Sequence, residues 1–331
     1  MSRAILFLLL ATSGRAVVTS RTPVVALAAI NRRVPVGDEN SLHLKVVYDE
    51  NRESSPCVLF FSGADCHHES YMWLASRLVS AGCAVALSTC VVPFGPTTCL
   101  LSMPFDLGAL ASLEEYKKNP SREGIAALIG ALAALNEADG ALAGKLDLDR
   151  LAVGGHSSGG RTALDLAAYD EPFGVRAVFS YGASLVNSGM GDFAPRGSVL
   201  PSDAPDPPPL LLLGGSEDGV SAALSASGDA TETLRRTLAE GVAAGSGSAE
   251  LCILEGANHM VFCEPIDPAC AAVKTDRALS AGASPEQIRS LLGAWPAHLL
   301  LHPCRMSCCP CSPPFAASLS FVLPHRMRQG V

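Results

Sequence analysis

Three polar residues that lie far apart in the chain are of the kinds that nucleophilic catalysis requires. Ser157 lies in "GGHSSGG", Asp218 in "GGSEDGV" and His259 in "GANHMVF". A serine hydroxyl is a weak nucleophile at its ordinary pKa, so it needs a base to take its proton and an acid to orient that base. The order serine, acid, histidine is one in which such triads occur. The sequence therefore predicts Ser157 as nucleophile, Asp218 as acid and His259 as base.

The segment around Ser157 has the pattern of a nucleophile elbow. Gly155-His156-Ser157-Ser158-Gly159 fits Gly-x-Ser-x-Gly, with an apolar run before it and a helical pattern after it. The turn is so sharp that the residues two before and two after the serine must be small, which is the expected role of Gly155 and Gly159. Ser158 is the weaker nucleophile candidate, because bulky His156 stands two positions before it. The alternative is a glycine-rich turn without chemistry.

Other residues near these positions offer alternatives. Glu217 is a second candidate acid, and Asp218 precedes a glycine, a dipeptide that is common in exposed turns. His259 could instead be a surface-loop histidine. His67 and His68 follow a buried strand and could border the pocket. We assign chemistry to neither of these two, nor to the histidine of the elbow.

An acyl-transfer site also needs N–H donors for the developing oxyanion. The backbone N–H of Ser158 is one candidate, because it begins a helix whose positive end faces the reacting centre. The second should come from the loop after "VLFFSG", where Ala64 is the first candidate and Gly63 the runner-up. Nothing around Cys66 marks it as a reactive thiol, so we expect a packed or disulfide-bonded cysteine there.

The elements that must position these residues alternate between strands and helices. Apolar runs predict strands at 42–50, 57–63, 83–88, 149–155, 175–182, 208–215 and 249–256. Helical patterns lie at 70–82, 122–138, 157–170, 230–242 and 284–295. This alternation predicts an α/β fold with a mostly parallel central sheet flanked by helices. Asp218 and His259 then lie at the carboxyl ends of strands, where open α/β sheets build their sites.

Length and composition indicate one folded domain between two atypical ends. The chain has 331 residues, of which 48% are hydrophobic and 17% charged, enough for a large core. We expect the domain at 36–302, because the loop at 189–209 is too short for a large cap and its flanking strands belong to one sheet. The net charge of −8 and the lack of a basic run exclude a nucleic-acid partner.

The first 35 residues read as a targeting leader. An arginine precedes the short apolar run Ala4–Ala11, which is typical of a secretory signal peptide and too short for a stable membrane span. A buried amino-terminal element is the alternative. More arginines follow without acids, so a two-part leader to a plastid or another organelle is a second possibility beside secretion.

Twelve cysteines fit an oxidising compartment. Cys90 with Cys99, or Cys263 with Cys270, could close short loops. The cysteine-rich tail at 303–331 has the wrong spacing for a zinc site, so we expect it to be poorly ordered and expect no metal; its four thiols are Cys304, Cys308, Cys309 and Cys311.

The region from Val46 to Phe262 resembles the α/β-hydrolase superfamily, and most closely its chlorophyllases, dienelactone hydrolases and cutinase-like esterases. The likeness rests on "PCVLFFSG", "LASRLVSAGCAVALS", "LDLDRLAVGGHSSGGRTALDLA", "PPLLLLGGSEDGV" and "EGANHMVF". "GHSSGGRTA" is similar to the elbow of chlorophyllases, whereas "SEDGV" and "GANHMVF" look like the acid and histidine loops of cutinase-like esterases. The resemblance implies an α/β-hydrolase fold without a large cap domain and a serine esterase without cofactor.

Two departures from these relatives bear on the substrate. The usual His-Gly of the oxyanion loop is Ser62-Gly63 here, and "SYGASLVNS" has no acid where chlorophyllases place theirs. The second departure argues against chlorophyll and favours Asp218 as the acid. The prediction is an enzyme that hydrolyses small-molecule or lipid-like carboxylic esters. The alternatives are a non-catalytic binding protein of the same fold, or chlorophyllase-type, acyltransferase or peptidase activity; the oligomeric state is left open.

Overall fold

The computed structural model describes residues 25–36, 40–94, 97–103, 121–168, 173–184, 208–242 and 249–301. Most of the expected leader, most of the loop at 189–209 and the cysteine-rich tail lie outside these residues. Within the described ranges, no helix is both long and apolar enough to span a bilayer.

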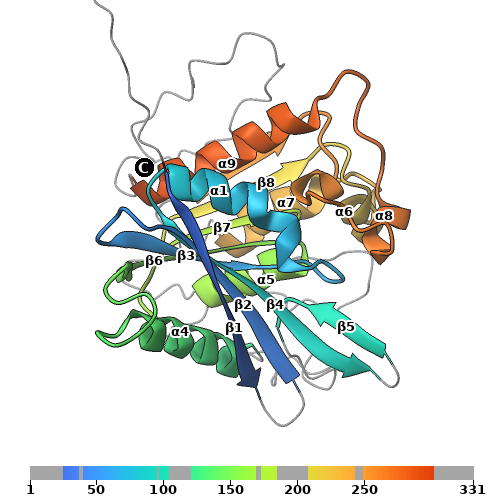
Figure 1. Cartoon of the computed structure of the whole chain (residues 1–331). Coiled ribbons are helices and arrows are strands. Elements are labelled where there is room, and N and C mark those ends of the chain that lie inside the picture. The colour runs from blue at the N-terminus through green and yellow to red at the C-terminus, as the bar shows by residue number, and fades with distance from the viewer. Residues whose placement is uncertain are drawn as a thin grey trace, which may run out of the picture.

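A nine-stranded mixed sheet forms the centre of the fold (Figure 1). Its order is β1-β2-β4-β3-β6-β7-β8-β9, and β5 pairs with β4. From β4 across to β9 the neighbours are parallel, whereas β1, β2 and β5 run antiparallel to their partners. The strands are β1 Leu27–Val36, β2 Asn40–Asp49, β3 Ser55–Phe61, β4 Ala84–Phe94, β5 Thr97–Leu101, β6 Leu146–His156, β7 Val175–Tyr181, β8 Leu210–Gly215 and β9 Ala249–Leu254.

Helices cover both faces of this sheet. On one face, α1 (Met72–Ser80) packs against α9 (Pro285–Leu301). On the other face lie α4 (Arg122–Asn136) and α5 (Ser158–Ala168), as Figure 1 shows for α4. Each face has its own buried apolar cluster, and residues of β3 alternate between the two. This two-faced burial explains why the central strands read as continuous apolar runs.

The helices largely confirm the periodic patterns. At the start of α9, the N–H of Gln287 donates to Ser284 Oγ at 3.4 Å, and Pro285 takes the first helical position. The helix expected at 230–242 is instead α7 (Glu232–Arg236) followed by a π-helical turn, Thr237–Val242. The remaining short helices are η1 His68–Tyr71, α6 Gly219–Leu224, η3 Met260–Phe262 and α8 Ala271–Thr275.

Two expectations, one about the start of the domain and one about disulfides, need correction. The boundary that we placed at residue 35 falls inside β1, which pairs with β2 along its whole length. Its mostly exposed residues and its Asn-Arg-Arg stretch conceal the strand in the sequence. The loop-closing disulfides left open above are also absent, since Cys90, Cys99, Cys263 and Cys270 are all free thiols.

Candidate active site

Ser157 occupies a strained turn between β6 and α5. Its φ is +55°, in the left-handed region that residues with a side chain rarely adopt. A Cβ on Gly155 would lie 2.1 Å from the carbonyl oxygen of Gly159, and a Cβ on Gly159 would lie 2.1 Å from that of Phe61. No side chain fits at either glycine, which is the steric reason for the Gly-x-Ser-x-Gly spacing.

Asp218 and His259 form a buried hydrogen-bonded pair. Asp218 Oδ2 lies 2.8 Å from His259 Nδ1, and both side chains are shielded from solvent. Asp218 also caps α6, because its Oδ1 accepts the N–H of Ser221 at 2.7 Å. A carboxylate can only accept from the ring, so Nδ1 carries the hydrogen and the lone pair of neutral His259 is on Nε2.

The environment tunes both members of the pair. Burial alone would raise the pKa of Asp218, but His259 and the N–H of Ser221 outweigh it and lower that pKa. Burial alone would lower the pKa of His259, but the Asp218 carboxylate outweighs it and raises that pKa. At neutral pH the acid is therefore ionised and holds the histidine as a stronger base.

The end of β7 separates Ser157 from this pair. The Ser157 N–H donates to the carbonyl of Tyr181 at 2.9 Å. The next residue, Gly182, has a φ of +62°, and a Cβ there would lie 2.8 Å from His259 Nδ1. Among the described residues, buried His259 Nε2 has no hydrogen-bond partner, so it is available to a serine hydroxyl or to a substrate. In free enzymes, catalytic hydrogen bonds often form only when substrate is bound.

The alternative acid and histidines lie elsewhere. Glu217 Oε1 accepts from Ser280 Oγ at 3.3 Å and is not the partner of His259. His67 and His68 are on the segment after β3, where His67 Nδ1 accepts the N–H of Glu69. Burial lowers the pKa of His68 to about 4.

The loop after β3 contains the expected oxyanion donors. The N–H of Gly63 donates to Tyr71 Oη at 3.0 Å, which removes Gly63 from the free donors. No described group accepts from the N–H of exposed Ala64, and Ser158 is the first residue of α5, where N–H groups have no partner within the helix. Ala64 and Ser158 therefore stay the two candidates. Hydrogen bonding to Cys263 and burial raise the pKa of Cys66 to about 12, which disfavours a nucleophilic role.

His156 connects the oxyanion loop to the candidate base. Tyr71 Oη accepts from Gly63 and lies 2.9 Å from His156 Nδ1, while His156 Nε2 lies 3.2 Å from the carbonyl oxygen of His259. A carbonyl can only accept, so Nε2 carries the hydrogen and Nδ1 accepts from the tyrosine. The chain Gly63, Tyr71, His156, His259 is thus polarised in one direction. It couples two loops that are far apart in the sequence.

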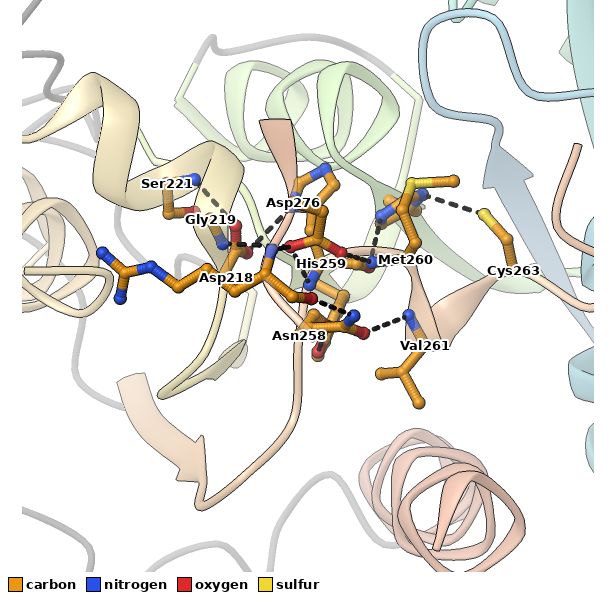
Figure 2. A network of polar contacts seen from close by, with 12 residues as sticks. Asp218, Gly219, Ser221, Asn258, His259, Met260, Val261, Cys263 and Asp276 are labelled. Carbon is orange, nitrogen blue, oxygen red and sulfur yellow. Dashed lines mark hydrogen bonds and ion pairs between the residues drawn. The ribbon is translucent and has the colours of Figure 1, made fainter. Parts of the chain in front are cut away.

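Asp276 is a site residue that the sequence analysis missed (Figure 2). Its Oδ1 accepts the N–H groups of Gly219 at 3.0 Å and His259 at 3.1 Å, and its Oδ2 accepts that of Met260 at 2.8 Å. One carboxylate thereby joins the acid loop to the histidine loop. The only sequence signal is a lone aspartate after a short helix, and its partners are backbone groups, which leave no pattern.

Comparison with known proteins identifies the fold. No protein-family model matches the sequence, and no curated protein does either. Three similar solved structures are a dienelactone hydrolase from Anabaena variabilis, a fungal esterase from Rhizomucor miehei and a predicted CIB-like hydrolase from Thermoplasma acidophilum. Their identities are 21%, 15% and 14%, with TM-scores of 0.46, 0.50 and 0.49.

Each of these alignments covers 82% of this chain, and they cover 98%, 83% and 100% of the three structures in the same order. Since the identities are low, the likeness to the Rhizomucor miehei esterase, with its TM-score of 0.50, bears on the fold alone. It agrees with the sheet order and with the strand, strained serine turn and helix described above. The chain has the α/β-hydrolase fold.

Proposed function

We propose that the protein is a serine hydrolase that cleaves carboxylic esters. The observation that carries this proposal is the buried pair of Asp218 and His259, 2.8 Å apart, together with the strained turn that holds Ser157. A strained serine after β6 and a buried acid–base pair after β8 and β9 are costly to maintain without a function. The Rhizomucor miehei relatives are esterases, which agrees with this reaction class.

The mechanism uses only groups of the chain itself. His259 Nε2 takes the proton of the Ser157 hydroxyl as its oxygen attacks the acyl carbon. Asp218 holds the ring with its hydrogen on Nδ1 and its lone pair on Nε2, and stabilises the imidazolium that forms. The N–H groups of Ser158 and Ala64 stabilise the oxyanion. His259 then gives the proton to the leaving alcohol, and water hydrolyses the acyl-enzyme by the same steps.

The substrate class is a small-molecule or lipid-like ester. Residues 104–120 and 185–207 lie outside the described residues. A series of esters with different acyl chains will determine the acyl preference of the enzyme.

Hydrolysis of p-nitrophenyl esters from acetate to palmitate, beside chlorophyll, tests the proposal with the native protein and Ser157→Ala. We expect p-nitrophenyl ester hydrolysis that is lost in the variant. Cleavage of chlorophyll alone would indicate a chlorophyllase, and transfer to an added alcohol in place of water would indicate an acyltransferase. A folded protein inactive on all of them would favour the non-catalytic binding role.

A further inference from the structure

Three buried side chains with metal-binding atoms meet beside the candidate triad. Cys66 comes from the oxyanion loop, His156 from the end of β6 and Cys263 from the end of the histidine loop. The two Sγ atoms lie 3.8 Å apart, and Cys263 Sγ lies 3.7 Å from His156 Nδ1. All three candidate ligand atoms lie within 4.8 Å of one another. Neither thiol has a role in the acyl chemistry proposed above.

The orientation of His156 directs a lone pair at these thiols. Its Nε2 lies 3.2 Å from the carbonyl oxygen of His259, so Nε2 must carry the ring hydrogen of the neutral imidazole. The unprotonated Nδ1 then faces Cys263 Sγ and Tyr71 Oη. In metal sites, a ligating histidine commonly donates its other N–H to a backbone carbonyl, which fixes the ring in the same way.

Two of the three separations match the edges of a tetrahedral metal site. Zinc–sulfur bonds of about 2.3 Å and zinc–nitrogen bonds of about 2.0–2.1 Å require S···S edges of about 3.8 Å and S···N edges of about 3.6 Å. The observed 3.8 Å and 3.7 Å agree with these values. Two thiolates would neutralise a divalent ion, which suits a site that excludes water.

We propose that Cys66, His156 and Cys263 form a structural site for a thiophilic transition metal ion such as Zn²⁺. Binding removes one proton from each thiol, forms two metal–thiolate bonds and one bond to His156 Nδ1, and releases two protons to solvent. Tyr71 Oη lies 3.6 Å from Cys263 Sγ, so its hydroxyl can turn from His156 to the new thiolate.

The ion would tie together three segments that flank the candidate triad. Its ligands come from the loop with Ala64, the strand end before Ser157 and the loop after His259. Such a site supports the geometry without touching an ester. The metal-site proposal is independent of the hydrolase proposal, since its test measures metal binding and not ester hydrolysis.

The alternative role of Cys66 is in a disulfide bond, since its Sγ also lies 3.9 Å from Cys270 Sγ. A disulfide would form by exchange with an external disulfide, joining Cys66 to either neighbour. It would use two of the sulfurs and would not involve His156 Nδ1, which lies 3.7 Å from Cys263 Sγ. We therefore favour the metal, and the test separates the two.

The experiment uses the full chain with the four tail cysteines replaced by serine, so that they do not compete for metal. This parent protein is reduced with a phosphine, stripped with a chelator and titrated with Co²⁺ and then Zn²⁺. Cys66→Ala and Cys263→Ala are the test variants. Cys83→Ala is the matched control, because Cys83 is an equally buried free thiol outside the cluster. Circular dichroism checks the fold of each.

We expect the parent and Cys83→Ala to bind one equivalent of Co²⁺ with thiolate-to-cobalt absorption, and Zn²⁺ to displace it. Both test variants should lose this absorption and the rise in melting temperature that Zn²⁺ gives the parent. X-ray absorption of the zinc-loaded parent needs no variant and should show two sulfur ligands and at least one nitrogen.

Three results would overturn the proposal. One is a folded, reduced parent without thiolate-to-cobalt absorption. The second is absorption that survives in both test variants. The third is a zinc spectrum without sulfur ligands. Mapping of a Cys66 disulfide in the unreduced protein, together with no metal uptake after reduction, would assign the cluster to a cross-link instead.

Discussion

Gly182 offers a direct test of the acid–base pair, because a matched control lies at the other end of the same strand. Gly182 follows β7 with a φ of +62°, and Gly174 precedes it with a φ of +63°. A Cβ on Gly182 would lie 2.8 Å from His259 Nδ1 and 3.0 Å from Asp218 Oδ2. Among the described residues, a Cβ on Gly174 would meet no atom within 4 Å. Alanine therefore introduces the same backbone strain at both glycines but a clash only at Gly182.

The size of each effect follows from this geometry. Alanine in the left-handed region costs about 1–2 kcal/mol, so both variants should melt a few degrees below the native protein. Carbon contacts begin near about 3.5 Å, so the imidazole of Gly182→Ala must move by roughly 0.7 Å. Since a misplacement of about 1 Å can cost about 100-fold in rate, we expect kcat to fall by about 10- to 100-fold with little change in KM.

The assay is steady-state hydrolysis of the best p-nitrophenyl ester, with thermal unfolding of the same samples. Gly174→Ala should keep the native kcat despite its lower melting temperature. If Gly182→Ala kept the native kcat while losing as much stability as Gly174→Ala, His259 paired with Asp218 would not be the catalytic base.

Further predictions concern pH, the bridging carboxylate and the elbow. Activity needs neutral His259, so kcat/KM should rise as pH increases through its raised pKa, and Asp218→Asn should lower kcat by about 10⁴-fold. Asp276 also raises the pKa of His259, so Asp276→Asn should move the acidic limb of the kcat/KM profile to lower pH, whereas a purely structural role would reduce kcat/KM without moving it. Gly159→Ala places a Cβ 2.1 Å from a β3 carbonyl oxygen and should unfold the protein, as read by circular dichroism. Its control is Gly130→Ala in α4, where a Cβ meets no described atom within 4 Å, and this variant should gain up to about 1 kcal/mol of stability in chemical denaturation.

Features that depend on a single segment of the chain could be predicted from the sequence. The glycines of the elbow predicted a sharp turn, and the structure shows the backbone contacts that exclude any side chain there. The continuous apolar runs predicted the central strands because those strands are buried on both faces. Glu217 and Asp218 are neighbours in the chain, so the order serine, acid, histidine could not separate them, and only the packing of the two loops places Asp218 on His259.

Features that depend on tertiary contacts could not be read from the chain. Asp276 acts through backbone N–H groups on two other loops, so it belongs to no motif. Cys66, His156 and Cys263 are separated by 90 and 107 residues along the chain and meet only after the sheet forms. β1 was hidden because an edge strand with mostly exposed residues needs no apolar pattern.

The most direct test of the central claim is covalent labelling of the native protein with a fluorophosphonate, followed by intact mass and peptide mapping. The account predicts one adduct, located on Ser157, absent in Ser157→Ala and formed much more slowly in His259→Gln. A folded protein that takes up no label, or that is labelled at another serine when Ser157 is intact, would contradict it.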